Sequence, residues 1–245
     1  MGLRDGKSGV AESDMINYRT ALIIGAGIGI SASLARALAR AGLKVGLVGR
    51  NPSKLESLAA ETGASVFRAD ASDPAAVNRL FKDVDASLGE PDVIAYNPSM
   101  RAHGSVAEID PVTVANALAV TAFGGFLAVQ QAAKRMIPRG HGAILLTGAS
   151  ASIKGFPLSA AFAMGKFALR GLAQSAAREL GPKGIHVAHF IIDGAVRSAR
   201  HPDPAERPDS TLDPDSIARA YIDVLRQPRD AWSFEVDLRP WVETF

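Results

Sequence analysis

A glycine-rich segment near the start of the chain is the first candidate for chemistry. Gly25-Ala26-Gly27-Ile28-Gly29 lies between a short apolar run and a helical pattern rich in Ala and Leu. Glycines at such a turn let phosphates approach the backbone N–H groups at the start of a helix, where the helix dipole favours negative charge. The turn therefore predicts that a dinucleotide binds through its pyrophosphate. A tight turn without a ligand is the weaker alternative, because the segment follows the first expected strand.

Arg50 is the second candidate, because it follows the second apolar run, Lys44–Val48. An acidic residue at this point of a dinucleotide-binding fold accepts the ribose hydroxyls and repels a 2′-phosphate, whereas an arginine can pair with that phosphate. Arg50 therefore predicts that NADP is preferred over NAD. The alternative is an arginine that is solvated beside the start of a helix.

A parallel sheet would position these residues, and the whole chain has the pattern of one. Apolar runs alternate with helical patterns, and the runs are nearly all apolar, as in strands covered on both faces. The expected strands are Thr20–Ile24, Lys44–Val48, Ala64–Ala69, Asp92–Tyr96, Ala143–Thr147, Ile185–Ile192 and Ser233–Leu238. The expected helices are Ser31–Arg40, Pro52–Ala60, Pro74–Leu88, Pro111–Met136, Ser159–Leu180 and Asp213–Arg226. Right-handed crossovers then give a doubly wound α/β sheet with strand order 3-2-1-4-5-6-7.

Composition restricts the class of protein. The chain has 245 residues, of which 47% are apolar and 21% charged, with a net charge of +2 and no cysteine. These values suit one domain, which we expect over residues 19–245 after a flexible extension over residues 1–18. Interleaved charges argue against nucleic acid, and the lack of cysteine excludes disulfides and cysteine-bound zinc. We expect no metal site, no membrane span and a cytoplasmic location.

Several short motifs resemble those of the short-chain dehydrogenase/reductase family, over residues 20–240. The family's T-G-x-x-x-G-I-G corresponds to Ile24–Ser31, its adenine-contacting acid to Asp70, and its N-N-A-G to Tyr96–Ser99. Asp193-Gly194 corresponds to its Pro-Gly, and Ser198 can replace a threonine that helps hold the carboxamide. The resemblance implies a Rossmann-type fold with a nicotinamide cofactor. The cofactor-binding set that it implies, with Arg50 included, is Gly25, Gly27, Ile28, Gly29, Ile30, Arg50, Asp70, Ala71, Asn97, Lys166 and Val196.

The catalytic motif departs from the family pattern. The family's Y-x-x-x-K appears as Phe162 to Lys166, its serine position holds Ala149, and its asparagine position holds Thr121. In the family, the lysine lowers the pKa of the tyrosine and holds the ribose, and the tyrosine transfers the proton. The loss of one positioned acid or base costs roughly 10²–10⁴ in rate. The loss of an oxyanion donor costs on the order of 10²–10³, and the two losses need not add.

Another motif spacing does not restore the tyrosine. Gly25 followed by Ser31 resembles the G-x5-S pattern of the divergent, enoyl-reductase branch, which uses Y-x6-K for catalysis. The position seven residues before Lys166 is Ser159 rather than tyrosine.

The resemblance and the neighbouring residues leave Lys166, Ser150 and Thr121 as candidate catalytic residues. Ser150 follows Ala149 and can donate a hydrogen bond, or it can be an ordinary loop serine. His103, in the loop after the fourth strand, can donate a proton near neutral pH, although an exposed loop histidine is favoured.

Three other features complete the sequence-based expectations. His189 is expected in the core, because it lies within an apolar strand. The loop 195–211 is expected to be a substrate lid, and its Arg197, Arg200, His201 and Arg207 weakly indicate an anionic or polar ligand, although a solvated mobile loop is favoured. The helices at 111–136 and 159–180 are rich in small residues, which permit close packing on the sheet. The family resemblance implies that these helices also form the subunit contact of a homodimer or homotetramer.

These observations leave three functions open. The first is an NADP-dependent oxidoreductase that acts on a small carbonyl compound or alcohol with degenerate catalytic residues. The second is a cofactor-binding sensor or partner subunit with little or no oxidoreductase activity. The third, reduction of an activated double bond, has no positive signature in the sequence.

Overall fold

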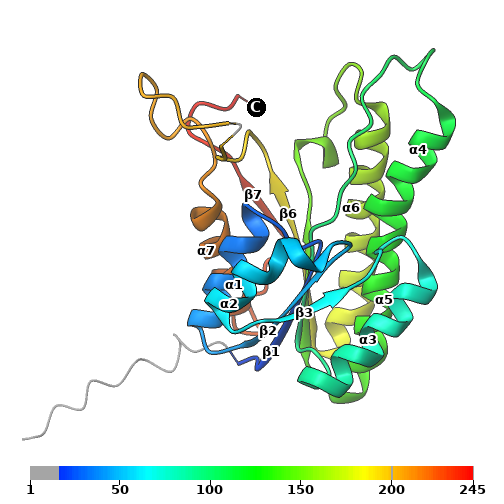
Figure 1. The fold of residues 1–245 in the computed structure, drawn as a ribbon, viewed down its shortest axis with the longest axis vertical. Coiled ribbons are helices and arrows are strands. Elements are labelled where there is room, and N and C mark those ends of the chain that lie inside the picture. The colour runs from blue at the N-terminus through cyan, green and yellow to red at the C-terminus, as the bar shows by residue number, and fades with distance from the viewer. Residues whose placement is uncertain (1–16, 200, 245) are drawn as a thin grey trace, which may run out of the picture.

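A computed structural model describes residues 17–199 and 201–244 of the chain. Most of the expected N-terminal extension, and Arg200, lie outside the described residues. The described chain forms one sheet between two layers of helices (Figure 1).

The sheet has seven parallel strands in the order β3-β2-β1-β4-β5-β6-β7, as the sequence predicted. The strands are β1 Thr20–Ile24, β2 Lys44–Gly49, β3 Ser65–Arg68, β4 Val93–Tyr96, β5 Gly142–Thr147, β6 Ile185–Ile192 and β7 Glu235–Leu238. Every residue of β1, β4, β5 and β6 is buried, because helices cover both faces. The order reverses between β1 and β4, and a ligand-binding crevice is typical at the carboxyl ends of the two strands where the order reverses.

Each face of the sheet carries its own helices and its own apolar core (Figure 1). One layer contains α1 Ile30–Arg40, α2 Glu56–Thr62 and α7 Pro214–Leu225. The other contains α3 Pro74–Leu88, α4 Pro111–Leu118, α5 Gly124–Arg139 and α6 Ala160–Leu180. The carboxyl edge of the sheet is therefore the place where both layers can contribute side chains to one site.

Three helix starts, those of α3, α4 and α7, are capped by an aspartate. The carboxylates of Asp73, Asp110 and Asp213 each accept a hydrogen bond from a backbone N–H two residues later. Asn51 does not cap in this way, because its side-chain oxygen accepts instead from the Ser53 hydroxyl at 2.8 Å. The first turn after Asn51, Pro52–Leu55, is a 3₁₀ helix, so α2 begins four residues later than expected.

The long helix expected over residues 111–136 is interrupted and extended. A π-helical turn at Ala119–Phe123 separates α4 from α5, and there the Tyr96 hydroxyl donates to the Val120 carbonyl at 2.5 Å. The helix also continues past Met136 to Arg139. Pro138 lies in its last turn, where a proline removes only one helical hydrogen bond, and Gly140 ends the helix in the left-handed conformation.

By length and composition alone, Pro111–Arg139 is the one helical stretch among the described residues that could cross a membrane. Its α5 portion packs against β4, β5 and α6. We therefore assign the apolar residues of α5 that face the sheet to the protein core.

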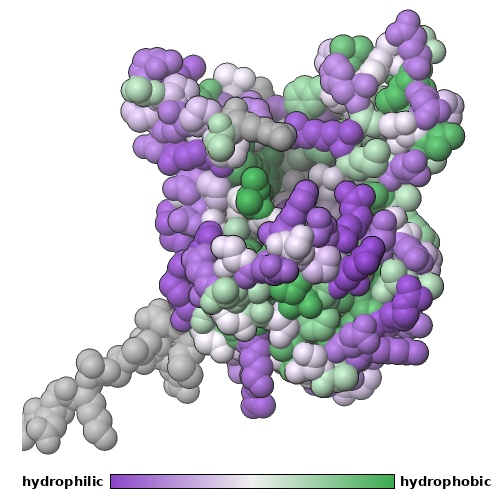
Figure 2. Space-filling view, in the orientation of Figure 1, coloured by the Kyte–Doolittle hydropathy of each residue, from purple (hydrophilic) through white to green (hydrophobic). Residues whose placement is uncertain are grey.

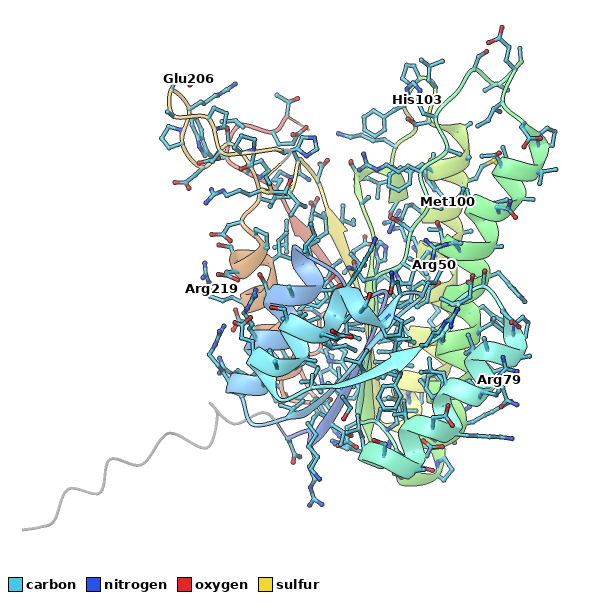
Figure 3. All side chains as sticks on the ribbon, viewed as in Figure 1. Arg50, Arg79, Met100, His103, Glu206 and Arg219 are labelled. Carbon is cyan, nitrogen blue, oxygen red and sulfur yellow. The ribbon has the colours of Figure 1, made fainter. Side chains whose placement is uncertain are left out.

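The carboxyl edge of the sheet is hollowed. Figure 2 shows this hollow between the lobe that contains the loop after β6 and the upper ends of α4 and α6. In Figure 3, Glu206 marks the loop on one side of the opening, and His103 marks the opposite side. The two layers of helices thus supply opposite walls of the hollow.

Candidate active site

The glycine turn forms the floor of the first cavity at the sheet edge. This cavity has a volume of about 590 Å³ and is lined by the turn, by the end of β2 and by the residues that follow β3 and β4. The Gly25 and Ala26 N–H groups donate to the Val48 carbonyl at 3.0 and 2.8 Å, which ties the turn to β2. Helical hydrogen bonding in α1 starts only with the Ser33 N–H, so the preceding N–H groups are those that a pyrophosphate would meet.

Ser31 replaces the third glycine of the family motif and closes the turn. Its hydroxyl donates to the Gly25 carbonyl at 3.1 Å and accepts from the Asn97 side-chain amide at 2.6 Å. These bonds join the loop after β1 to the loop after β4. The serine at this position is therefore compatible with a tight turn, and it fixes Asn97 beside the cavity.

We expect Gly25 to be required for the backbone conformation of the turn, and Gly27 for the space that a ligand occupies. Alanine at each position separates the two roles. Gly25 has a φ of +79°, and an added Cβ would lie 2.7 Å from Pro98, whereas Gly27 has open space on that side. We expect Gly25→Ala to lower the free energy of unfolding by about 2 kcal/mol or more. We expect Gly27→Ala to change stability by less than about 0.5 kcal/mol, while NADPH binding weakens because the methyl group points into ligand space.

Urea unfolding and NADPH titration of both variants test this assignment. Equal losses of stability in Gly25→Ala and Gly27→Ala would contradict it. Unchanged NADPH affinity in Gly27→Ala would remove the turn from the proposed pyrophosphate site.

Basic and polar residues surround the end of the first cavity at β2. Arg50, Asn51 and Lys54 line this end, and Figure 3 labels Arg50 at the carboxyl edge of the sheet. Asp70 and Ala71, which follow β3, line the same cavity. Hydrogen bonds from the Ser72 hydroxyl and N–H hold the pKa of Asp70 below its usual value, and the Arg50 charge adds to the effect. The arrangement offers an anionic acceptor at Asp70 and positive charge at Arg50.

Two further cavities continue from the turn toward β5 and β6. The second, about 520 Å³, is lined by Ile28, Gly29, Ile30, Val196 and Ser198 among others. The third, about 340 Å³, contains Lys166 and Phe162 in its wall. Asn97 lines all three cavities, so the predicted cofactor residues follow one continuous edge of the sheet.

Lys166 is buried in the wall of the third cavity. Its side chain donates to the Thr147 carbonyl at 2.7 Å, and the residue is only 3% exposed. Burial, with a smaller contribution from the Arg101 charge, lowers the pKa of Lys166 to about 7. No carboxylate lies within ion-pair distance of Lys166 in the described part of the chain. The Lys166 amine therefore changes its charge near neutral pH.

The depressed pKa of Lys166 predicts how stability depends on pH. The folded pKa lies below the ordinary value of 10.5, so the unfolded chain binds the proton more tightly. The contribution of Lys166 to stability consequently rises with pH between about 7 and 10.5, by up to about 1.4 kcal/mol per pH unit. We expect wild type to gain stability relative to Lys166→Met over this range, measured by urea unfolding.

Lys82→Met, at an exposed lysine of α3, is the matched control and should follow the wild-type curve. Parallel curves for wild type and Lys166→Met would contradict the depressed pKa.

Two cations lie close to the Phe162 ring. The ring lies 4.8 Å from the Arg101 guanidinium carbon and 5.9 Å from Lys166 Nζ, measured to the ring centroid. Phe162 and Arg101 line both the third cavity and a neighbouring cavity of about 430 Å³ that contains Ser150 and His103. The two cavities thus meet at the Phe162 ring, whose edge carries no hydroxyl.

Ala149, which occupies the position of the family's serine, lies at one end of a short chain of hydrogen bonds. The Ala149 N–H donates to Ser152 Oγ at 3.1 Å, and Ser152 Oγ lies 3.4 Å from His189 Nε2. His189 Nδ1 lies 3.0 Å from the Glu235 carboxylate. Burial lowers the pKa of His189 to about 4, so the neutral ring donates to Glu235 and accepts from Ser152. The expectation that His189 is a core residue is confirmed, since the residue is fully buried.

Ser152 and Glu235 are not among the residues that the sequence predicted for the site. The signal for Glu235 was available in the strand order, because His189 and Glu235 are register partners in β6 and β7. Ser152 had no such signal, because it lies in an unpredicted 3₁₀ turn, Ser150–Ser152.

Thr121 lies outside the cavities. It is 1% exposed, packs against Gly165 and accepts a hydrogen bond from the Met100 N–H at 3.1 Å. Its hydroxyl therefore fixes the segment after β4 and contacts no cavity among the described residues.

The basic residues of the loop 195–211 are mostly engaged elsewhere. Arg197 pairs with Asp203 at 3.2 Å and with Asp209 at 3.3 Å, and Arg207 lies over the Trp241 ring. His201 lines the third cavity. Of the described basic residues in this loop, His201 is therefore the one placed in the wall of the Lys166 cavity.

Comparison with known proteins agrees with this geometry. Residues 19–202 match the short chain dehydrogenase family. The chain belongs to the short-chain dehydrogenase/reductase family. It is 34% identical to "Inactive 2-(S)-hydroxypropyl-CoM dehydrogenase 2" of Xanthobacter autotrophicus over 167 residues, which cover 67% of this chain and 72% of the relative.

Solved structures of the family share the whole fold. A short-chain dehydrogenase from Rhodopseudomonas palustris is 33% identical with a TM-score of 0.78, and the match covers 91% of this chain and 99% of the other. A metagenomic short-chain oxidoreductase in complex with NADP is 25% identical with a TM-score of 0.81, and the match covers 94% and 100% of the two chains. The expected fold and family are thereby confirmed.

Proposed function

We propose that this protein is an NADP-dependent oxidoreductase that transfers hydride to a small carbonyl compound, or from the corresponding alcohol, without a tyrosine proton donor. The observation that carries the proposal is the continuity of the three cavities from Arg50 past the glycine turn to Lys166. The preference for NADP rests on Arg50 and Lys54 at the end of β2 and on the absence of an acid there. The similarity to an oxidoreductase solved with NADP supports it.

A cofactor held along these cavities would supply or accept the hydride, and the protein would stabilise the charge that develops on the substrate oxygen. Reduction of a carbonyl places negative charge on that oxygen, and a nearby cation stabilises it. Lys166 and Arg101 both provide positive charge near the Phe162 ring. Since Phe162 cannot donate a proton, we propose that water or the Lys166 ammonium protonates the product. The reaction is then slower than in relatives with a tyrosine.

NADPH oxidation with a panel of small aldehydes and ketones tests the proposal. We expect slow turnover by wild type, loss of turnover in Lys166→Met, and wild-type behaviour in Lys82→Met. No turnover of any substrate, despite tight NADPH binding, would contradict it.

Tight NADPH binding without turnover of any substrate would support a second candidate, a cofactor-binding sensor or partner subunit of the same fold. The observation that favours this candidate is the simultaneous loss of the tyrosine and serine hydroxyls at Phe162 and Ala149. Ordinary turnover rates in wild type would exclude it.

We also propose that the protein is a cytoplasmic homodimer or homotetramer whose substrate is a small molecule, with no nucleic acid or membrane partner. Large apolar side chains on the outer sides of the π turn, α5 and α6 are exposed: Phe123, Phe126, Met164 and Phe167. Several exposed large apolar side chains on neighbouring helical elements are typical of a protein–protein interface.

Light scattering after gel filtration tests this association. We expect wild type to elute as an oligomer, and a Phe126→Glu/Phe167→Glu variant to elute as a monomer with unchanged helix content. A monomeric wild type at micromolar concentration would contradict the proposal.

A further inference from the structure

Arg101 is a cation placed at the centre of the proposed active site. It follows β4 by five residues and lines both cavities that meet at Phe162. The described chain contains no carboxylate in ion-pair contact with Arg101. A guanidinium that is exposed to a cavity and unpaired with a carboxylate is available to a ligand.

The backbone on both sides of Arg101 is held in place. The Met100 N–H bonds to Thr121 Oγ1 at 3.1 Å, Ala102 is buried, and the Gly104 N–H bonds to the Leu158 carbonyl at 2.9 Å. The backbone at Arg101 is therefore held in place. Thr121 is a positioning residue, because its hydroxyl holds the neighbouring Met100 N–H.

The contact with Phe162 orients the guanidinium. A guanidinium that stacks on an aromatic face keeps its N–H edges free to form two parallel hydrogen bonds with a carboxylate or a similar oxyanion. The replacement of tyrosine by phenylalanine leaves the end of this ring without a polar group. An anion that reaches the ring edge therefore has Arg101 as its hydrogen-bond donor.

The charges around the third cavity also favour an anion. Arg101, Lys166 and His201 line it, and no acidic residue of the described chain does. The neighbouring cavity contains the carboxylates of Asp193 and Glu243. Asp193 is 2% exposed and lies 3.9 Å from the Lys154 amine, so its charge is partly compensated. The excess positive charge therefore lines the third cavity.

We propose that the substrate is a small carbonyl compound that carries an anionic group, and that Arg101 binds this group beside Phe162. The inference rests on the proposed function, because it names the substrate class of the same site. A carboxylate fits the planar fork of the guanidinium, and a sulfonate or phosphate would use the same donors. Arg101 then acts as a specificity-determining residue.

A matched pair of ligands tests the inference without requiring turnover. Acetoacetate and methyl acetoacetate differ by the carboxylate charge and one methyl group. Calorimetric titration of each ligand into the NADP⁺-loaded protein should show acetoacetate binding at least about tenfold more tightly in wild type. In Arg101→Gln the preference should fall to about one.

The matched control is Arg79→Gln. Arg79 is exposed on α3, and Figure 3 labels it away from Met100 and the upper hollow. This variant has the same charge change as Arg101→Gln and should keep the wild-type preference. A preference that persists in Arg101→Gln, equal binding of both ligands to wild type, or no binding of either would overturn the inference.

Three further measurements test the role of Thr121, distinguish the anion site from the proposed function, and compare oxyanions. Thr121→Val should weaken acetoacetate binding while NADPH affinity is kept, and Thr121→Ser should restore it, because only serine keeps the bond to Met100. Arg101-dependent binding of acetoacetate without NADPH oxidation would support the anion site and contradict the proposed function. Titration with methanesulfonate and inorganic phosphate shows which oxyanion is preferred.

Discussion

The double variant Phe162→Tyr/Ala149→Ser should reduce carbonyl substrates about 10²- to 10⁴-fold faster than wild type, expressed as kcat/KM. The new phenol would lie at the end of a ring that already sits 5.9 Å from Lys166 Nζ. A nearby cation lowers the pKa of a phenol and favours proton transfer near neutral pH. The serine would add an oxyanion donor beside it.

The structure explains why two substitutions should suffice. Lys166 is buried and bonded to the Thr147 carbonyl, so its position does not depend on a tyrosine. The 3₁₀ turn after Ala149 is fixed by the bond from the Ala149 N–H to Ser152. The scaffold for the missing hydroxyls is therefore present.

Phe167→Tyr is the matched control, because Phe167 lies on the same helix but is 44% exposed on its outer side. It adds the same hydroxyl outside the cavity and should leave kcat/KM unchanged. A triple variant that also carries Lys166→Met should lose most of the gain. No gain in the double variant, with its fold and NADPH affinity intact, would show that the geometry around Phe162 does not support the family's proton transfer.

The second large effect is expected at Arg50. Arg50→Ala should weaken NADPH binding by about 10- to 100-fold, because a charge-assisted hydrogen bond contributes roughly 1.5–3 kcal/mol. NADH binding should change by less than twofold, since NADH lacks the 2′-phosphate. Isothermal titration of both cofactors into wild type and Arg50→Ala measures the effect.

Arg79→Ala controls for the change of net charge and should bind both cofactors as wild type does. Raised salt should weaken NADPH more than NADH in wild type, because the 2′-phosphate contact is electrostatic. Equal affinity of wild type for NADPH and NADH would overturn the proposed cofactor preference.

Strand order could be predicted because it follows from the alternation of apolar runs and helices together with right-handed crossovers. The glycine turn and Arg50 could be placed beside one cavity for the same reason, since residues at the carboxyl ends of adjacent strands meet. The π turn at Ala119–Phe123 could not be predicted, because it accompanies a tertiary contact, the bond from Tyr96 to Val120.

Side-chain partnerships were the other part that sequence could not supply. Arg197 indicated a polar ligand, and only the folded loop shows that it pairs with Asp203 and Asp209. Arg101 belongs to no motif that the sequence analysis could identify. Its position over Phe162 depends on how the loop after β4 packs near α6. The anion-binding role thus moves from the loop 195–211 to Arg101.

Under the proposed function, this chain transfers hydride even though Phe162 has no proton to donate. The most direct measurement uses NADPH deuterated at C4 of the nicotinamide, with mass spectrometry of the alcohol formed from acetoacetate and from a panel of neutral aldehydes and ketones. We predict slow, enzyme-dependent incorporation of deuterium at the former carbonyl carbon, lost in Lys166→Met. Saturated NADPH binding with no deuterium in any product would contradict the account.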